Sequence, residues 1–528
     1  MERVIVLNRR RFMAASGSVL AAPALAQGSN SRVLKFIPQA DLTVLDPIWT
    51  TAYVTRNHGL AIFDTLYGLD ASYRAQPQMA AGHVTEDDGK TWKITLRPGL
   101  KFHDGTPVLA RDCVASIARW GKRDAMGQTL MSYTDELSAP DDTTIQFRLK
   151  KPFVLLPDAL GKVGSQICAI MPERLAKTDA FTQVTEMVGS GPFRFKADER
   201  IVGARVVYEK FADYVPREGG EPQWTSGPKR AYVDRVEWTV IPDQATAASA
   251  MQTGEMDWWE QPPADLVPTL RGLTTTIKDP TGLIGTLRMN QLLPPFDNPA
   301  IRQVLLKVID QSDFMQAVTG TDPKLMHAPV GFFCPKLPMA SDVGLGALTS
   351  KRDFEAAKKE LAAAGYKGEK IVLMGASDFP TLKALADVAA DTLSRAGFNV
   401  DYQVMDWGTV VQRRAKKEPI SQGGWNVFCT FWAGLDQANP AVSSFLRGNG
   451  ANAAIGWPTS EGIEALRVKW LDAPDVAGQK AVAAEIQKQA FVDLPYLPLG
   501  QYFVQTSFKP NITGVLNGVP VFWNVKKG

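Results

Sequence analysis

The sequence predicts an α/β protein of more than one domain. A chain of 528 residues exceeds what one hydrophobic core usually supports, so two or three domains are expected. Residues 351–405 alternate helical and strand patterns, and residues 77–120 combine turns, a strand and a helix. Apolar residues make up 45% of the chain and charged residues 21%, which is typical of a globular protein with a packed interior.

The segment 77–120 predicts a compact unit of turns, strands and one helix. Asp87–Gly89 has the composition of a hairpin turn, and Trp92–Leu96 alternates apolar and polar residues as a half-buried strand does. A short strand is expected at Leu100–His103, between two further turns. A helix then begins near Ala110, with apolar residues on one face through Trp120.

The clearest α/β rhythm lies in residues 351–405. It predicts a helix at Asp353–Ala364, a strand at Ile371–Met374, a helix at Thr381–Ala396 and a strand at Asn399–Met405. Glycines at 365 and 397 follow the two helices, as C-terminal caps do. A strand, a helix and a strand in this order imply a parallel pair.

The first 26 residues have the composition of an export leader. Asn8–Met13 reads NRRRFM and resembles a twin-arginine motif, an Ala-rich run follows, and Ala24–Ala26 is an A-x-A cleavage site. The apolar run is too short to span a bilayer. The formal net charge of +3 resides in this segment, which holds four arginines and one glutamate. The rest is formally neutral, which excludes a basic surface for nucleic acid.

The sequence lacks the common catalytic and cofactor motifs. It has no H-E-x-x-H, C-x-x-C or G-x-S-x-G, and Gly448–Ala453 fits a dinucleotide pattern without a preceding strand. No cofactor and no metal site are predicted. Of the four cysteines, Cys113 and Cys168 lie in apolar patterns of buried thiols, and Cys334 with Cys429 is the pair favoured as a disulfide.

Residues 88–112 follow the pattern D-G-x-x-W-x-I-x-L-R-x-G-x-K-F-H-D-G-x-P-x-x-A-x-D. This closely resembles the signature of the family 5 extracellular solute-binding proteins, the oligopeptide, dipeptide and nickel receptors of bacterial ABC importers. The L-D-P turn at 45–47 and the Gly189–Phe193 turn resemble the same family. Departures at His83 (usually Trp) and Cys113 (usually Val) are packing substitutions. His103 lies inside the signature and is expected to support the fold.

The resemblance implies a three-domain α/β periplasmic binding protein, with two lobes around a hinged cleft (type II, cluster C-like). Domain I would comprise 27–68, 186–282 and 497–528, domain II 69–185, and domain III 283–496, with chain crossovers near 280 and 497. Ile62–Tyr67 resembles a helix of the family, and Leu499–Val504 and Gly514–Trp523 are expected to be strands that return to domain I.

The remaining elements are read from local patterns. Strands are expected at Val33–Pro38, Thr144–Leu149, Phe193–Phe195, Val233–Ile241 and Val427–Trp432, and helices at Gln244–Thr253 and Pro299–Ile309.

Four residues are predicted to bind the ligand. The strand Val427–Trp432 ends in a polar loop, where ligands lie in α/β sheets. Peptide receptors of the family carry W-x-x-D-x-x-D-P there, and Trp432 and Asp436 match it with one extra residue. Asp436 would then pair with a ligand amine, while Trp432 and Tyr53 offer flat apolar walls and Trp407 is a further candidate. Asp436 as a turn cap is the alternative.

The resemblance implies a soluble, monomeric, non-enzymatic receptor that passes a small-molecule or peptide ligand to membrane permease subunits. The loop 375–380 has no Arg or Lys, so a dipeptide-carboxylate clamp is not supported there. Longer peptides, amines, opines and sugars remain open. The rival function is a secreted hydrolase, which needs a carboxylate pair where this chain has Asp436 and Asn439.

Overall fold

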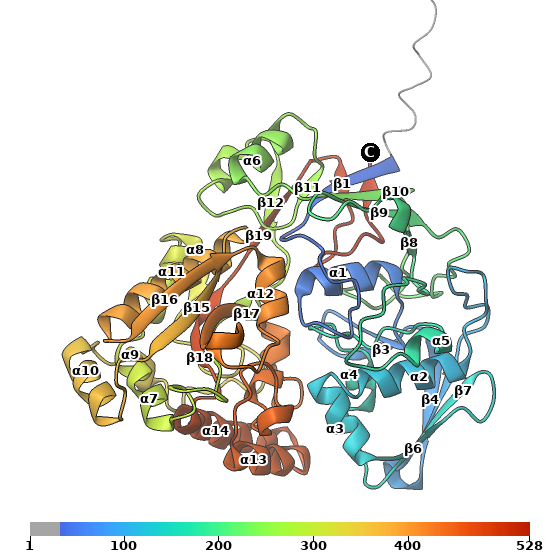
Figure 1. Cartoon of the computed structure of the whole chain (residues 1–528). Coiled ribbons are helices and arrows are strands. Elements are labelled where there is room, and N and C mark those ends of the chain that lie inside the picture. Colours follow the sequence, from blue (N-terminus) through green and yellow to red (C-terminus); the bar gives the residue numbers. More distant parts are fainter. Residues whose placement is uncertain (1–31) are drawn as a thin grey trace, which may run out of the picture.

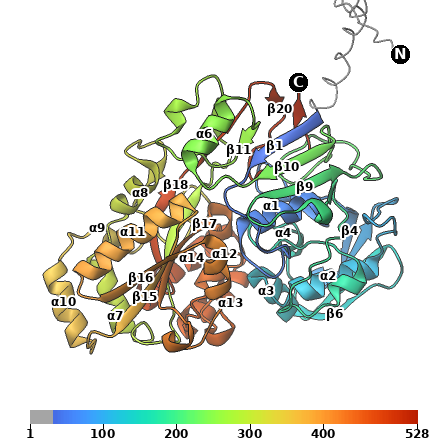
Figure 2. The ribbon, with the colours of Figure 1, turned by 45° about the horizontal axis from the view of Figure 1, so that its top comes forward.

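The structure, a computed structural model, describes residues 32–528, and in it the chain forms two lobes (Figures 1 and 2). The first lobe holds residues 32–277 and 505–528, and the second holds residues 283–502. Two segments, 278–282 and 503–504, connect them. In Figure 1 the second lobe is the yellow-to-red body at the left, and the blue and cyan part of the first lobe lies at the right.

The first lobe contains two large sheets. The order of the seven-stranded sheet is β12 (Thr274–Ile277), β19 (Gln505–Phe508), β11 (Trp258–Trp259), β1 (Val33–Ile37), β10 (Arg235–Thr239), β9 (Arg205–Lys210), β8 (Phe193–Phe195). The order of the four-stranded sheet is β4 (Ala80–Glu86), β5 (Thr91–Leu96), β7 (Thr144–Leu149), β6 (Thr134–Ser138). Strand β1 is parallel to β10 and β11, and the four-stranded sheet is antiparallel. The strands predicted in these sheets are confirmed: Val33–Pro38, Trp92–Leu96, Thr144–Leu149, Phe193–Phe195 and Val233–Ile241.

The helices of the first lobe cover these sheets. They are α1 (Tyr53–Ile62), α2 (Ala110–Trp120), α3 (Ala125–Tyr133), α4 (Leu156–Leu160), α5 (Glu173–Ala176) and α6 (Gln244–Gln252). Helix α2 begins at the predicted residue, and Cys113, Ile117 and Trp120 are fully buried on its inner face. Two small pairs complete the lobe: β2 (Tyr67–Leu69) with β3 (Ala75–Pro77), and β20 (Ile512–Thr513) with β21 (Lys526–Lys527).

The second lobe is built on one six-stranded sheet. Its order is β14 (Met326–His327), β18 (Leu497–Tyr502), β13 (Leu283–Met289), β17 (Val427–Ala433), β15 (Lys370–Ala376), β16 (Asn399–Met405). The predicted parallel pairing of β15 with β16 is confirmed. Its helices are α7 (Pro299–Val304), α8 (Gln311–Thr319), α9 (Gly346–Thr349), α10 (Phe354–Ala363), α11 (Pro380–Arg395), α12 (Trp407–Arg413), α13 (Glu461–Leu471) and α14 (Val476–Asp493).

His103 joins two of the family motifs. Its Nε2 lies 3.0 Å from the Gly191 carbonyl, and its Nδ1 accepts a hydrogen bond of 3.2 Å from the Gly189 N–H. Burial lowers the pKa of His103 to about 4, so the ring is neutral at pH 7. The expected structural role of His103 is therefore confirmed.

Several local predictions are wrong. Leu100–His103 is no strand, because Phe102 and Thr106 close a tight turn with a hydrogen bond of 2.8 Å. The helix expected at Ile62–Tyr67 is not formed, because α1 ends at Ile62 and the backbone is extended at Phe63. The Asp64 carboxylate then accepts a hydrogen bond from the Thr65 N–H.

The C-terminal strands also differ from the prediction. Strand β18 pairs with β13 inside the second lobe, so the chain crosses at 503–504 rather than near 497. Residues 514–523 form no strand and contain Gly518, whose N–H is bonded to the Lys278 carbonyl. The first crossover, 278–282, lies where it was expected. The three-domain division itself stays a prediction.

The predicted disulfide is absent. All four cysteines are free and buried, as expected for Cys113 and Cys168. Cys429 faces Leu385 of α11, whereas Cys334 packs with Ile284, whose side chain lies on the other face of the sheet. The sheet therefore separates Cys334 from Cys429. The predicted leader, residues 1–26, lies outside the described residues.

Candidate functional site

The end of β17 is where the two lobes meet. All seven residues of β17 are buried, and the turn Gly434–Gln437 that follows carries Asp436. A side chain at position 434 would collide with the Thr281 carbonyl. Because glycine has none, the turn can lie against the connecting segment. Tyr53, the first residue of α1, approaches from the first lobe.

Asp436 is bound by groups of the first lobe. The Tyr53 hydroxyl donates a hydrogen bond of 2.7 Å to its Oδ2, and the Ser165 N–H lies 3.2 Å from both oxygens. The Lys162 ammonium is 3.7 Å from Oδ1, but it lies closer to Asp124, at 2.7 Å. Asp436 is 1% exposed, so these contacts form a fully buried polar junction between the lobes.

The single positive charge of Lys162 is shared unequally between Asp124 and Asp436. Burial alone lowers the pKa of Lys162, but the attraction of Asp124 and Asp436 outweighs it, and the pKa is raised. Burial raises the pKa of Asp436, against the opposing effects of Lys162, the Tyr53 hydroxyl and the charge of Arg56, which forms no ion pair with Asp436 within residues 32–528. One ammonium between two carboxylates neutralises only one of them, and the nearer one is Asp124. Asp436 therefore keeps an incompletely compensated charge.

Aromatic rings extend the junction on both sides. The Tyr53 ring stacks on Phe431 at 5.7 Å, Phe431 contacts Phe379 at 5.7 Å, and Phe379 contacts Trp407 at 5.9 Å. On the other side Trp432 lies 6.0 Å from Tyr53 and stacks on Phe445 at 4.1 Å. The structure thus brings the four predicted site residues into one interlobe cluster, which we call the partition: Tyr53, Asp436, Trp432, Trp407, Phe431 and Phe379.

A cavity of about 640 Å³ lies between the lobes on one side of the partition. Its walls come from the loop at Trp49–Thr51 and the start of α3 in the first lobe, and from the end of α12 and residues 444–457 in the second. Phe445, the stacking partner of Trp432, lines it. The lining includes no carboxylate, and its cations are Lys122, Arg123, Arg414, Lys417 and Arg447. We call it the basic cavity.

Arg414 is the most buried of these cations. It is 4% exposed, its Nη2 donates a hydrogen bond of 3.2 Å to Thr51 in the other lobe, and its Nε has no partner among the described residues. Its guanidinium lies 5.3 Å from the Trp407 ring. Burial lowers the pKa of Arg414 to about 10, which still leaves it charged at pH 7. A buried guanidinium with a free N–H is suited to bind an anion.

The other cations of this cavity are also largely uncompensated. Arg123 donates to the Trp49 carbonyl at 2.6 Å, and its Nε has no partner in residues 32–528. Within those residues only Arg447 of the five forms an ion pair, with Glu464 at 3.2 Å. Arg447 also reaches the Ala125 carbonyl of the first lobe, at 3.3 Å. Positive charge from both lobes therefore converges on this cavity.

The sequence-based prediction found the partition and missed the basic cavity. None of Tyr53, Asp436, Trp432 and Trp407 lines the basic cavity itself. Arg414 belongs to a basic run, Arg413–Lys417, at the C-terminal end of α12, and this run was the one available signal. Arg123 and Arg447 are far from it in sequence, and only the fold brings them together.

Residues 32–528 contain no group of three or more His, Cys, Asp or Glu side chains placed to hold a metal ion. No helix in the same range is long and apolar enough to cross a membrane.

Comparison with known proteins gives the family. Residues 74–453 match the model of the bacterial extracellular solute-binding proteins, family 5. A probable peptide ABC transporter periplasmic-binding protein of Sinorhizobium fredii is 37% identical over 522 residues, which cover 97% of each chain. A glutathione-binding protein of Pectobacterium atrosepticum is 24% identical over 532 residues, 97% of this chain and 96% of that protein.

Solved structures show the same fold. A periplasmic binding protein from A. tumefaciens R10 in complex with agropinic acid gives a TM-score of 0.78 at 23% identity, over 94% of this chain and 99% of that one. A periplasmic binding protein from Helicobacter pylori in complex with the peptide STSA gives 0.77 at 22% identity, with the same coverage. This chain therefore belongs to the bacterial extracellular solute-binding proteins of family 5 and has the two-lobed type II fold of periplasmic binding proteins.

Proposed function

We propose that this protein is the substrate-binding component of an ABC importer and that its solute is a peptide-like molecule with at least one carboxylate. The family supports the receptor role, and the relative at 37% identity is named for peptide transport. The observation that carries the anionic solute is the basic cavity, which lies between the lobes and has five cations and no carboxylate among its lining residues. An anion enclosed there would meet uncompensated positive charge at low dielectric.

Arg414 and Arg123 would hold the solute carboxylate. They face the cavity from different lobes, and each has a buried Nε with no partner in the described residues. A planar guanidinium can donate two parallel hydrogen bonds to a carboxylate. A carboxylate bound by both arginines would bridge the two lobes. Binding would therefore shift the equilibrium between open and closed lobes toward the closed form.

In this binding mode the partition would lie behind one wall of the site, where the lining residue Phe445 stacks on Trp432. The incompletely compensated Asp436 would attract the solute ammonium, with Tyr53 and Trp432 beside the solute's body. Trp407 would act by holding Arg414 through its ring. The ammonium of a peptide would compete with Lys162 for Asp436. Lys162 lies 3.7 Å from Asp436 and 2.7 Å from Asp124, so its ion pair with Asp436 is the weaker of its two.

The sequence and the family support a proposal for the biological setting. We propose that residues 1–26 direct export by the twin-arginine route and that the mature chain acts in the periplasm as a monomer. It would pass its solute to membrane permease subunits without making or breaking a bond. Domains I and II would form the first lobe and domain III the second, with residues 497–502 assigned to domain III because β18 pairs with β13.

The first prediction concerns Arg414. Mass spectrometry of material that co-purifies with the exported protein should identify a solute that carries a carboxylate. Calorimetry with that solute should show at least tenfold weaker binding for Arg414→Gln, or about 1.4 kcal/mol, because a hydrogen-bonded charge pair is lost. Asp436→Asn should weaken it similarly when the solute also has an ammonium.

Arg271→Gln is the matched control, because Arg271 is exposed and lies outside the basic cavity. It should bind the solute as the parent protein does. A neutral or purely cationic solute, or equal affinity in Arg414→Gln, would contradict the anion-binding role. Steady turnover of the solute by the pure protein would contradict the receptor role.

A further inference from the structure

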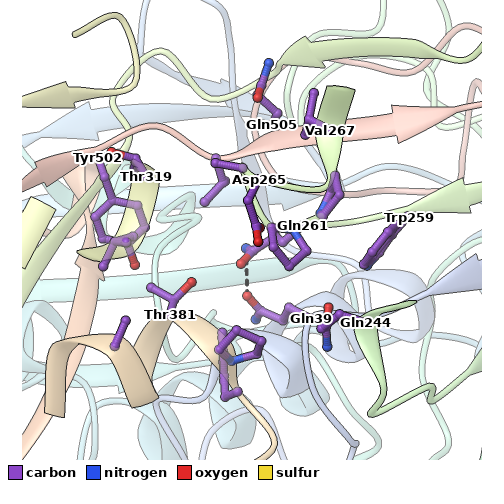
Figure 3. A pocket seen from close by; sticks show the side chains of 18 of the residues that line it. Gln39, Gln244, Trp259, Gln261, Asp265, Val267, Thr319, Thr381, Tyr502 and Gln505 are labelled. Carbon is purple, nitrogen blue, oxygen red and sulfur yellow. Dashed lines mark hydrogen bonds between the residues drawn. The ribbon is translucent and has the colours of Figure 1, made fainter. Parts of the chain in front are cut away.

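A second cavity, of about 750 Å³, lies between the lobes on the other side of the partition (Figure 3). The first lobe contributes the segments that follow β1 and β11, and the second contributes the end of α8 and the start of α11. The connecting segment at 503–504 forms part of the wall. It shares no lining residue with the basic cavity.

The charge of this cavity is opposite to that of the basic cavity. Its lining contains no Lys, Arg or His, and its carboxylates are Asp41, Asp265, Asp322 and Asp378. None of the four forms an ion pair within residues 32–528. Asp41 belongs to the first lobe and Asp378 to the second. We call this space the acidic cavity.

The carboxylates of Asp41 and Asp378 are half-buried and held by backbone groups. Asp41 Oδ2 accepts a hydrogen bond of 3.0 Å from the Gly203 N–H, and Asp378 Oδ1 accepts one of 2.6 Å from the Trp407 N–H. Burial raises the pKa of both carboxyl groups. For Asp41 the hydrogen bond from Gly203 and the charge of Arg200 act against burial, whereas the charge of Asp378 acts with it. Two like charges that oppose each other across the lobes favour a cation between them.

Tyr502 gives an independent indication of a ligand. It lies at the end of β18, lines the acidic cavity and has no exposed surface. Its hydroxyl has no hydrogen-bond partner among residues 32–528. Figure 3 places its ring on the same side of the cavity as Thr319 and Thr381. An unpaired buried hydroxyl costs free energy unless a bound molecule pairs with it.

The remaining lining residues favour an organic ligand over a metal ion. The carboxylates form no group of three that could hold a metal within the described residues. The lining also has apolar surface, from Trp259, Phe379 and Val267. At the cavity wall, the Gln261 amide donates a hydrogen bond of 2.8 Å to the Gln39 side-chain oxygen (Figure 3). Such a mixture fits an alkyl chain that carries ammonium groups.

We propose that the acidic cavity is a second binding site, which takes an aliphatic diamine or a similar organic cation. Its ammonium groups would lie between Asp41 and Asp378, with Tyr502 accepting a hydrogen bond from one of them. The site goes beyond the proposed solute receptor function, because it uses none of the residues of the basic cavity. A cation there would contact both lobes beside the connecting segment.

The test is calorimetric titration of 1,4-diaminobutane into the mature chain, residues 27–528, at low ionic strength. We expect one site per chain. Asp378→Asn should weaken binding at least tenfold, and Tyr502→Phe at least threefold. Asp135→Asn, at an exposed aspartate of β6 outside both cavities, is the matched control and should bind as the parent does. Uncharged 1,4-butanediol should not bind.

Three outcomes would overturn the proposal. They are the absence of diamine binding, equal affinity in Asp378→Asn and the parent, and equal weakening by Asp135→Asn, which would indicate a general charge effect. Tyr502→Phe should leave thermal stability unchanged or raise it, because the hydroxyl it removes is unpaired without a ligand. Arg414→Gln should leave diamine binding intact, so failure of this site is distinguishable from failure of the solute site.

Discussion

At the scale of single residues, the electrostatics of the lobe junction are set by a shortage of cations: one lysine is shared by two buried carboxylates. Lys162 serves Asp124 at 2.7 Å and Asp436 at 3.7 Å, while Arg56 lies over the Tyr53 ring at 4.4 Å and donates to Asn57. Buried carboxylates are costly unless they are paired or hydrogen-bonded. Asp436, the more distant of the two from Lys162, therefore relies on the neutral donors Tyr53 and Ser165, and burial raises its pKa.

Glu260 gives a prediction at this scale. It is 6% exposed, accepts hydrogen bonds from Gln39 N–H at 2.7 Å and Asn57 at 3.0 Å, and burial raises its pKa from 4.5 to about 7. A raised pKa means that stability is fully present below pH 4.5 and is lost as the pH rises through 7. Glu260→Gln removes this loss.

The variant should therefore gain stability relative to the parent between pH 4.5 and 8, by about 3 kcal/mol at most. The measurement is the midpoint of urea unfolding at the two pH values. A constant difference between the two proteins would show that Glu260 has an ordinary pKa.

Residue types alone could not reveal the whole candidate site. Trp432 was predictable because it lies at the end of a buried strand, and Asp436 because it follows that strand. Tyr53 was predictable because it ends an aromatic and hydroxyl-rich loop. Arg414 and Arg123 are ordinary in sequence, and what distinguishes them is the lack of a carboxylate partner after folding. That property depends on long-range contacts such as that of Arg414 with Thr51, which lies 363 positions away in the sequence.

At the scale of elements, strands with strong patterns were predictable and their partners were not. Strands β5, β7 and β17 alternate or run apolar in the sequence, and each lies within two residues of its predicted range. Strand β18 was recognised as a strand but assigned to the wrong lobe. Pairing with β13 depends on contacts across more than 200 residues, and local periodicity carries no record of it.

The loop that holds Lys162 and Ser165 offers a prediction at this scale. It crosses from the first lobe onto the turn that carries Asp436, and a side chain at Gly164 would overlap with Asp436 Oδ1. Gly164→Ala should push this loop away from the turn and disfavour the closed arrangement. We expect the affinity for the co-purified solute to fall about tenfold while each lobe stays folded.

Gly82→Ala is a suitable control, because a side chain at Gly82 in β4 would meet nothing within 4 Å. It should bind the solute normally. Small-angle X-ray scattering should show a larger radius of gyration for the solute-saturated Gly164→Ala protein than for the control. Equal radii and equal affinities would mean that this contact has no part in closure.

At the scale of the whole molecule, the partition divides the interlobe space into two cavities of opposite charge. Both have walls from both lobes, and the acidic cavity also includes the connecting segment at 503–504. A ligand in either cavity gains contacts on both sides only when the lobes are together. Two ligands that favour the same arrangement must each increase the affinity for the other, because coupling free energies are reciprocal.

Binding of the diamine should therefore strengthen binding of the solute. With saturating 1,4-diaminobutane, the affinity for the co-purified solute should rise about fivefold, the low end of typical coupling between sites. The reverse titration should show the same factor. In Asp378→Asn the enhancement should disappear while the basal solute affinity stays close to that of the parent, because Asp378 lines only the acidic cavity. A fall in solute affinity would instead indicate that both molecules compete for one cleft, and an unchanged value would show that the two cavities are not linked through closure.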